Sequence, residues 1–324
     1  MRAVLCKSYG PPENLVIEDV VAPEAGPGEV VINARAIGLN FFDTLIIQDK
    51  YQFKPPLPFS PGAELAGVIN SVGADVDGLA EGDLVMAYTK HGAAREQVAV
   101  PASHVIPVPQ DLDLAIAAGL TVTYGTSYHA LKDRADLQPG ETLAVLGASG
   151  GVGQSAVEIG KAMGARVIAC ASSSDKLDFC RSVGADEVIN YAEEDLKDRL
   201  KELTGGKGAD VIYDPVGGDL AEAAVRATAW NGRFLVIGFA AGEIPKIPLN
   251  LVLLKGCSLV GVFWGAFIER HPDRHITNMT TLLNWCLEGK INPHIHDRIP
   301  LDETPAALRA FLNREVKGKI VVQP

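Results

Sequence analysis

The sequence predicts an α/β protein in which a doubly wound parallel sheet is joined to a second, β-rich domain. From about residue 121 to 289, short apolar runs alternate with helix-like stretches, and a glycine-rich turn follows the first run. The flanking segments, 1–120 and 290–324, have the composition of irregular β structure. Repeated strand–helix–strand units place parallel strands in one sheet with helices on both faces.

The β-rich domain is predicted from Val- and Ile-rich runs that are separated by turn sequences. Between Met1 and about Asp111, runs such as VVINARAIG and DLVMAY alternate with PGE, PGAE and EGD. Such runs bounded by Gly and Pro are typical of strands. The same texture returns from about Asn292 and ends in GKIVVQP. We therefore expect the C-terminal segment to rejoin this domain as a strand.

The second domain is predicted strand by strand. A helical pattern at 111–132 leads into it, and a glycine near the end of a helical stretch is a common stop signal. The expected strands are TLAVLGA, RVIACASS, DEVINY, DVIYDPVG, RFLVIGF and SLVGVFW. The expected helices are GVGQSAVEIGKAMG, SDKLDFCRSVG, EEDLKDRLKELTGG and DLAEAAVRATAWNG.

Composition and charge exclude several classes of function. The formal net charge is −11 and no block of basic residues is present, which argues against a nucleic-acid surface. No apolar run approaches the roughly 18 residues of a membrane span, and the N-terminus lacks the apolar core of a signal peptide. The five scattered cysteines have no zinc-site spacing, so we expect reduced, structural thiols. These observations predict a cytoplasmic protein without nucleic-acid or membrane partners.

A glycine-rich turn predicts a dinucleotide site. Gly147, Gly150 and Gly153 complete a GxxGxxG pattern, with Gly151 beside them, between a buried strand and an amphipathic helix. Ala148 breaks the alternative GxGxxG pattern. Missing Cβ atoms let the backbone approach a pyrophosphate, and the N-terminus of the helix stabilises its charge. This context predicts a Rossmann domain rather than a merely structural turn.

The end of the second strand favours NADPH over NADH. NAD-preferring sites usually carry an acid there, whereas this chain has Ala171 followed by Ser172, Ser173 and Ser174. Small hydroxyl side chains leave room for a 2′-phosphate, and Lys176 can supply the opposite charge. Asp175 is an unfavourable neighbour. A helix N-cap with a solvated lysine is the alternative interpretation, and the two are compatible.

The whole chain resembles the medium-chain dehydrogenase/reductase superfamily, and within it the zinc-free quinone oxidoreductase branch that includes zeta-crystallin. The resemblance rests on AIGLNFFDTLIIQDKYQ, LPFSPGAELAGVINSVGADVDGLAEGDLV, TSYHAL, GASGGVG, VIYDPVGGD, GRFLVIGF and GKIVV. It implies a Rossmann domain plus a GroES-like substrate domain, and a homodimer. Where zinc dehydrogenases carry a catalytic Cys and a His-Glu pair, this chain has Asn40 and Gly62-Ala63-Glu64, so no metal site is expected. An arginine frequent in the branch is replaced by Ile47.

The resemblance also implies site residues. Around the nicotinamide and the acceptor it places Asn40, Asp43, Tyr51 and Thr126. Along the pyrophosphate and the adenosine 2′-phosphate it places Gly150, Gly151, Val152, Gly153, Ser172, Lys176 and Tyr191. Looser candidates on the nicotinamide side are Gly238, Phe239, Phe263 and Lys319.

The predicted reaction is hydride transfer from NADPH to a quinone or another conjugated carbonyl. Tyr51 would donate a proton or hydrogen bond, Asn40 would stabilise the oxyanion, and Asp43 would act as a buried support. An enone or enoyl-thioester (enoyl-CoA) reductase and a non-catalytic NADPH-binding protein remain as alternatives.

Three further features have open interpretations. ERHPDRH (residues 269–275) is expected to be a solvated turn rather than a metal site, and His294 and His296 are not expected to bind metal either. SLVGVFW is a candidate edge strand that pairs across a dimer. Trp264 with Phe263 and Phe267 would line the acceptor pocket, or belong to a core or interface.

Overall fold

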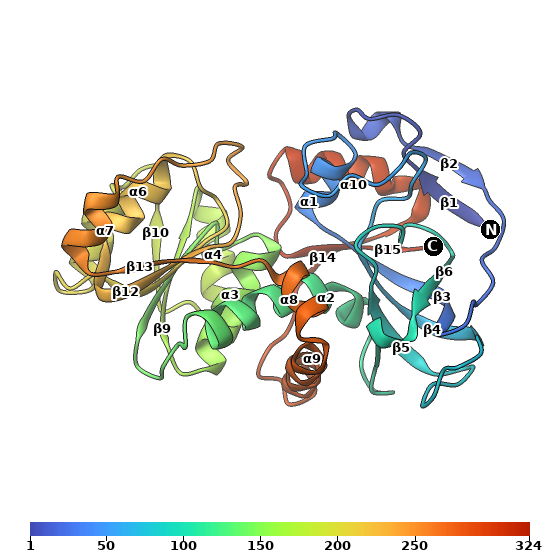
Figure 1. Cartoon of the computed structure of the whole chain (residues 1–324). Helices are drawn as coiled ribbons and strands as arrows, with labels where there is room; N and C mark the ends of the chain where they lie inside the picture. The colour runs from blue at the N-terminus through green and yellow to red at the C-terminus, as the bar shows by residue number, and fades with distance from the viewer. The chain divides into compact units, whose positions relative to one another are not determined.

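The computed structural model describes residues 1–324 and divides into two compact units (Figure 1). Unit 1 comprises Met1–Val122, His271–Leu287 and Pro293–Pro324, and unit 2 comprises Thr123–Arg270 and Glu288–Asn292. The sequence analysis assigned residues 271–287 to the second domain, whereas their contacts group them with unit 1.

Unit 1 is built on a seven-stranded, mainly antiparallel sheet with the order β14-β15-β3-β4-β5-β7, and β6 pairs with β3. Its strands are β3 (Glu29–Leu39), β4 (Glu64–Val72), β5 (Leu84–Tyr88), β6 (Gln97–Pro101), β7 (Val105–Pro107), β14 (Ile295–Pro300) and β15 (Lys319–Gln323), and a separate pair is formed by β1 (Arg2–Leu5) and β2 (Val16–Asp19). Ile320 lies opposite Leu39, so the predicted return of the C-terminal segment as a strand is confirmed.

The core of unit 1 comes from the Val- and Ile-rich strands. Ile32, Ile37, Leu65 and Val322 have no exposed surface, and burial of each such side chain stabilises the fold by roughly 1.5–3 kcal/mol. The helices of this unit are α1 (Phe41–Ile46), α9 (Pro272–Leu287) and α10 (Thr304–Leu312), with 3₁₀ turns at Pro12–Asn14, Ala102–His104 and Leu301–Glu303. The helix α2 (Leu114–Tyr128) contains the residue at which the chain passes into unit 2.

Unit 2 holds a six-stranded parallel sheet with the order β10-β9-β8-β11-β12-β13. The strands are β8 (Thr142–Leu146), β9 (Arg166–Ala171), β10 (Glu187–Asn190), β11 (Ala209–Asp214), β12 (Thr228–Val236) and β13 (Ser258–Gly261). All six predicted strands are present. The strand order reverses between β8 and β11, and such a reversal opens a ligand-binding crevice at the carboxyl ends of the strands.

The four helices expected in unit 2 are present, one of them with different bounds, and two further helices at 249–255 and 264–270 were not expected from the sequence. They are α3 (Gly151–Ala162), α4 (Ser174–Ser182), α5 (Leu196–Leu203), α6 (Asp219–Arg226), α7 (Leu249–Lys255) and α8 (Trp264–Arg270), and a π-helix (His129–Arg134) continues α2. The expected helix at 219–232 is too long, because Thr228–Gly232 belong to β12. Thr228 pairs with Ala209, and a Cβ at Gly232 would lie 3.0 Å from Asp210 O, so this glycine serves strand packing rather than helix termination.

The expectation of a solvated turn at ERHPDRH is wrong for every residue but His271, because Glu269 and Arg270 end α8 and residues 272–275 begin α9. Pro272 is the first residue of α9, a position where its missing N–H costs nothing. His275 on this helix is buried, and burial, with a smaller contribution from His104, lowers its pKa to about 4.

The three aromatic residues near 264 differ in burial. A Cβ at Gly125 would lie 2.9 Å from Trp264 Cζ2, so this glycine makes room for the buried indole. Phe267 is buried and stacks on His129 with ring centroids 3.9 Å apart. Phe263 is 66% exposed. Trp264 and Phe267 are therefore buried side chains, whereas Phe263 lies at the surface.

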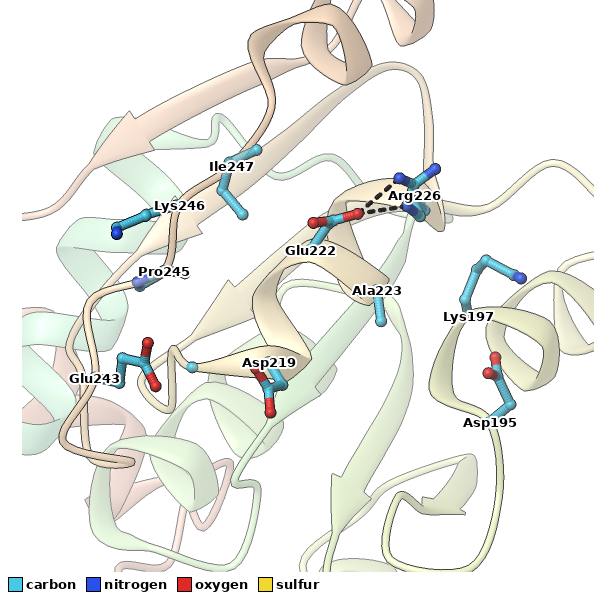
Figure 2. A pocket seen from close by; sticks show the side chains of 11 residues that line it. Asp195, Lys197, Asp219, Glu222, Ala223, Arg226, Glu243, Pro245, Lys246 and Ile247 are labelled. Atoms are coloured by element: carbon cyan, nitrogen blue, oxygen red, sulfur yellow. Dashed lines mark hydrogen bonds and ion pairs between the residues drawn. The ribbon is translucent and has the colours of Figure 1, made fainter.

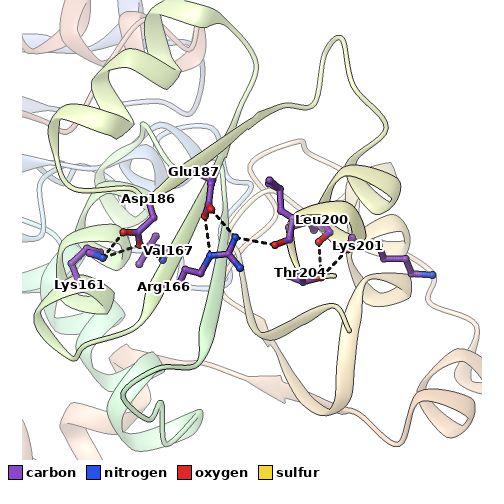
Figure 3. Close-up of polar contacts among 9 residues, drawn as sticks. Lys161, Arg166, Val167, Asp186, Glu187, Leu200, Lys201 and Thr204 are labelled. Carbon is purple, nitrogen blue, oxygen red and sulfur yellow. Dashed lines mark hydrogen bonds and ion pairs between the residues drawn. The ribbon is translucent and has the colours of Figure 1, made fainter. Parts of the chain in front are cut away.

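Ion pairs join the amino ends of β9 and β10 (Figure 3). Arg166 donates to both carboxylate oxygens of Glu187, at 3.1 and 2.6 Å, and to Leu203 O at 2.9 Å. Beside it, Lys161 contacts both oxygens of Asp186, which also accepts from Val167 N. These charges lie at the edge opposite the carboxyl ends of the strands.

Candidate functional site

The predicted cofactor residues of unit 2 gather at the carboxyl edge of its sheet. Except for Thr126, which lies on α2 before the first of these strands, they follow the ends of parallel strands, although their segments are far apart in the sequence. The glycine turn follows β8, Ser172 follows β9, Tyr191 follows β10, Gly238 and Phe239 follow β12, and Phe263 follows β13. The parallel sheet therefore brings these residues to one edge.

The glycine turn has the geometry of an anion cradle. Gly147 has φ of +56°, which favours glycine, and Gly150 is the N-cap of the twelve-residue helix α3. A Cβ at Gly153 would lie 2.3 Å from Gly147 O, so only glycine lets the helix start this close to the strand. A dinucleotide pyrophosphate fits this turn, because the first N–H groups of α3 have no acceptor in the helix.

A buried hydroxyl network that the sequence analysis missed supports this turn. Ser127 Oγ on α2 lies 2.7 Å from Tyr213 Oη on β11 and 2.8 Å from Ser155 Oγ on α3. Both serine hydroxyls lie within 3.1 Å of Val152 O. The network thus holds the Val152 carbonyl within the turn. Ser127, which takes part in it, directly follows Thr126 in the chain. Its members show no local motif and meet only in the folded unit.

The adenosine end combines small hydroxyl residues with the start of a helix. Ser173 is the N-cap position of α4, Ser172 is exposed, and Lys176 lies in the first turn. Tyr191 N donates to Ala171 O at 3.1 Å, which places Tyr191 beside the serine segment. The N-cap interpretation of Ser173 and a 2′-phosphate role for Ser172 and Lys176 are thus compatible in this geometry.

A buried aspartate shapes the loop after β11. Asp214 Oδ1 accepts from Val216 N at 2.8 Å and Gly217 N at 2.9 Å, and burial raises the pKa of Asp214. Asp214 O also accepts from Ile237 N at 3.0 Å, just before Gly238. The carboxylate therefore fixes the loop after β11, and the backbone carbonyl of Asp214 holds the end of β12 beside the end of β11.

A polar cluster is buried in unit 1 around Asn40. Lys319 Nζ donates to Glu64 Oε1 at 2.6 Å, Asn40 Oδ1 at 2.7 Å and Leu39 O at 2.7 Å. Asn40 Nδ2 donates to Glu64 Oε1 at 2.8 Å, and Glu64 Oε2 accepts from Val122 N at 2.6 Å. The amide of Asn40 is fixed in orientation. The ammonium of Lys319 makes all three of these hydrogen bonds within unit 1. A contact between Lys319 and the nicotinamide therefore stays a prediction.

Asp43 supports this cluster from α1. Its carboxylate accepts from Asn40 N at 2.8 Å and from Gly62 N at 3.0 Å, and the side chain has no exposed surface. Burial raises the pKa of Asp43 to about 7, although the two N–H bonds and the charge of Lys319 lower it. These contacts suit the support role that the sequence analysis expects for Asp43.

Tyr51 is the available phenol of unit 1. Its ring stacks on Phe42 with centroids 5.3 Å apart, and its hydroxyl has no hydrogen-bond partner within the chain. Burial, and to a lesser extent the Asp43 charge, raise the pKa of Tyr51. The phenol therefore stays protonated at neutral pH and can donate to a ligand.

The residues of this cluster do not fit zinc. Of the three ligand positions of zinc dehydrogenases, only Glu64 keeps its side-chain type, and its carboxylate lies 2.6 Å from the ammonium of Lys319. Asn40 and Ala63 supply neither thiolate nor imidazole. Across the chain, no group of three or more His, Cys, Asp and Glu side chains is arranged to hold a metal ion.

A pocket of about 450 Å³ lies on unit 2 (Figure 2). It contains side chains of both signs, and Figure 2 shows Arg226 bound to Glu222 at its rim. It is lined by Asp195, Lys197, Gly218, Asp219, Glu222, Ala223, Arg226, Glu243, Pro245, Lys246 and Ile247. No predicted site residue is among them.

Family models match both parts of the chain. Residues 26–110 match the alcohol dehydrogenase GroES-like domain, and residues 151–283 match the family described as zinc-binding dehydrogenase. The chain is 39% identical to the quinone oxidoreductase-like protein 2 homolog of Nematostella vectensis, over 99% of this chain and 88% of the relative. The chain belongs to the quinone oxidoreductase branch of the medium-chain dehydrogenase/reductase superfamily.

Solved structures of superfamily members agree with this assignment. A probable oxidoreductase from Mycobacterium abscessus has a TM-score of 0.91 at 40% identity and covers 100% of this chain and 99% of its own. The Escherichia coli quinone oxidoreductase complexed with NADPH has a TM-score of 0.94 at 28% identity and covers both chains fully. The predicted α/β fold with a GroES-like domain is confirmed, and the chain is an oxidoreductase. None of its helices has the length and apolar character needed to cross a membrane.

Proposed function

We propose that this oxidoreductase transfers hydride from NADPH to a quinone or another conjugated carbonyl compound without zinc. The observation that carries the proposal is the glycine turn at the N-terminus of α3, beside the reversal of strand order in unit 2. The serine segment and Lys176 support NADPH over NADH. The Escherichia coli relative, which was solved with NADPH, supports the same cofactor.

Zinc-free chemistry is supported by the cluster around Asn40. A zinc dehydrogenase polarises an alcohol oxygen through its metal. Here the Glu64 carboxylate forms an ion pair with Lys319, and the thiolate and the imidazole that would complete a zinc site are missing. Such a chain needs an acceptor that is already electrophilic. Quinones, enones and enoyl thioesters meet this condition.

The protein's own residues orient the reactants and supply a proton. When bound, the reduced nicotinamide supplies a hydride to the acceptor, which leaves negative charge on the acceptor oxygen. The Tyr51 hydroxyl, free of partners in the chain, donates a hydrogen bond or proton to that oxygen. Asp43 and Lys319 hold Asn40 in one orientation, and Asn40 is the proposed second contact to the oxyanion.

A homodimer is part of the proposal. The strand β13 is at one edge of the unit 2 sheet, as the sequence predicts, and it leaves unpaired backbone groups. Exposed apolar side chains lie on and near it, at Leu249, Leu253, Leu254, Leu259 and Phe263. A second copy that pairs along β13 would cover both the unpaired backbone groups and these apolar side chains. Light scattering coupled to size exclusion should give twice the chain mass, and a monomer would contradict this part.

The test of the activity follows the nicotinamide absorbance with NADPH or NADH and four acceptors. These are benzoquinone, 1,4-naphthoquinone, a simple enone and crotonyl-CoA. We expect rapid NADPH oxidation with a quinone or the enone. Preference for crotonyl-CoA would reassign the chain as an enoyl-thioester reductase. NADPH binding without turnover of any acceptor would identify a non-catalytic binding protein.

A further inference from the structure

Unit 1 contains a second polar cluster, around Arg95. Arg95 Nη2 donates to Ser60 Oγ at 3.0 Å, and this is the only hydrogen bond of the guanidinium within the chain. No carboxylate pairs with this arginine. Burial lowers the pKa of Arg95, and no neighbouring acid opposes the shift. A guanidinium held this way has unused donors and an uncompensated charge, whereas largely buried charges are normally paired.

Three polar atoms near Arg95 are buried without a hydrogen-bond partner. They are Thr89 Oγ1, His91 Nδ1 and Arg95 Nε. Buried polar groups are nearly always hydrogen-bonded, so three unsatisfied ones within seven residues are a marked departure from ordinary packing. Burial, followed by the charges of Arg95 and Lys90, lowers the pKa of His91, which shows that its surroundings are electropositive.

Aromatic rings hold His91 in place. Its ring lies 5.4 Å from the ring of Phe53 and 5.9 Å from that of Phe59, the latter edge-on. Phe59 is buried, whereas Phe53 is 41% exposed. The cluster thus joins the Arg95 guanidinium to an accessible aromatic face, a combination that suits an unsaturated ligand with an acidic substituent.

The backbone links this cluster directly to the Asn40 cluster. Gly92 N donates to Ser60 O at 2.8 Å and Ala93 N donates to Gly62 O at 2.9 Å. Gly62 N in turn donates to Asp43 Oδ1. The segment 60–62 therefore contacts Gly92, Ala93 and Arg95 as well as the carboxylate that supports Asn40, all within one unit.

We propose that Ser60, His91 and Arg95 form a binding site for an oxyanion, a carboxylate or a phosphate, carried by the acceptor. The inference rests on the proposed function, because it names the class of acceptor as an acidic conjugated carbonyl compound. Arg95 binds the oxyanion, Ser60 orients the guanidinium, and Phe53 with His91 packs against the unsaturated part.

The first test compares two acceptors at saturating NADPH, neutral 1,4-naphthoquinone and 1,4-naphthoquinone-2-sulfonate. In the Arg95→Gln variant, the ratio of kcat/KM for the sulfonate to that for the neutral quinone should fall roughly tenfold to a hundredfold, the usual effect of losing a charge-assisted hydrogen bond. The two quinones differ in their own reactivity, but this difference is the same for both proteins and cancels when the ratio of the variant is compared with that of the wild type. Arg35→Gln is the matched control, since Arg35 is an exposed arginine of β3 and the ratio should stay unchanged. An unchanged ratio in Arg95→Gln would overturn the inference.

The second test measures binding by calorimetry and is independent of turnover. Benzoate and phenyl phosphate are titrated into the NADPH-saturated protein, with benzamide as the neutral control. Tighter binding of benzoate identifies a carboxylate site and tighter binding of phenyl phosphate a phosphate site, and either should weaken in Arg95→Gln. If neither anion binds better than benzamide, the inference is wrong even if quinones turn over. If the anions bind but no acceptor is reduced, the proposed function fails and the anion site stands.

Discussion

Lys319 Nζ lies 2.6 Å from Glu64 Oε1, and the two side chains are only 3% and 0% exposed. These residues are 255 positions apart in the sequence, on β15 and β4. The same ammonium orients the Asn40 amide at 2.7 Å. The pair therefore acts both on the stability of unit 1 and on the geometry of the proposed site.

Removing the cation should destabilise the protein strongly. Lys319→Met leaves the Glu64 carboxylate buried without its partner, and breaking such a pair costs about 3–5 kcal/mol. The free energy of unfolding from urea titration measures the change. The double variant Lys319→Met with Glu64→Gln should recover part of this loss, because the unpaired charge is gone. Additive effects of the two substitutions would show that the pair is not coupled.

Tyr51→Phe should lower kcat about a hundredfold, the usual range for loss of a general acid, without weakening NADPH binding. The phenol has no partner in the chain, so the melting temperature should stay close to that of the wild type. Steady-state kinetics and fluorescence titration of NADPH measure the two effects. Equal kcat in both proteins would remove Tyr51 from the mechanism.

Lys176→Ala should raise the KM for NADPH at least tenfold and leave the KM for NADH nearly unchanged. Only NADPH carries the 2′-phosphate that this ammonium is proposed to pair with. Lys207→Ala is the matched control, since Lys207 is an exposed lysine of unit 2 outside the site. Equal effects of Lys176→Ala on both cofactors would contradict the 2′-phosphate role.

The raised pKa of Asp43 predicts a pH dependence of stability. Its pKa is about 7 in the fold and 3.8 in the unfolded chain, so between these values the folded protein binds the extra proton. The Asp43 contribution to stability is therefore complete below about pH 4 and decreases as pH rises to about 7. Between these two pH values, the unfolding free energy of Asp43→Asn should lack the part of the pH dependence that the uptake of one proton by Asp43 causes. An unchanged slope would show that Asp43 titrates normally.

The sequence predicted those parts of the fold that depend on local patterns. Six apolar runs became the six parallel strands, and the glycine turn lies where its spacing requires. Local patterns failed at Thr228–Gly232, where pairing with β11 overrides a helical composition, and at Pro272, which starts a helix instead of interrupting a turn.

The polar contacts of the site were less accessible to prediction. Tyr213, Ser127 and Ser155 meet from three different elements, and Arg95 meets Ser60 across 35 residues. No periodicity or spacing connects such residues, because tertiary packing alone brings them together. Asn40 and Asp43 could be named in advance because the segment that contains them resembles the family, and the structure places them three residues apart at the start of one helix.

The central claim is tested most directly by NADPH oxidation with 1,4-naphthoquinone, using protein that was purified with a chelator and whose zinc content was measured by mass spectrometry. The account predicts rapid turnover by protein with far less than one zinc per chain, and no gain when zinc is added. Activity that is absent after chelation and rises in proportion to added zinc would contradict it.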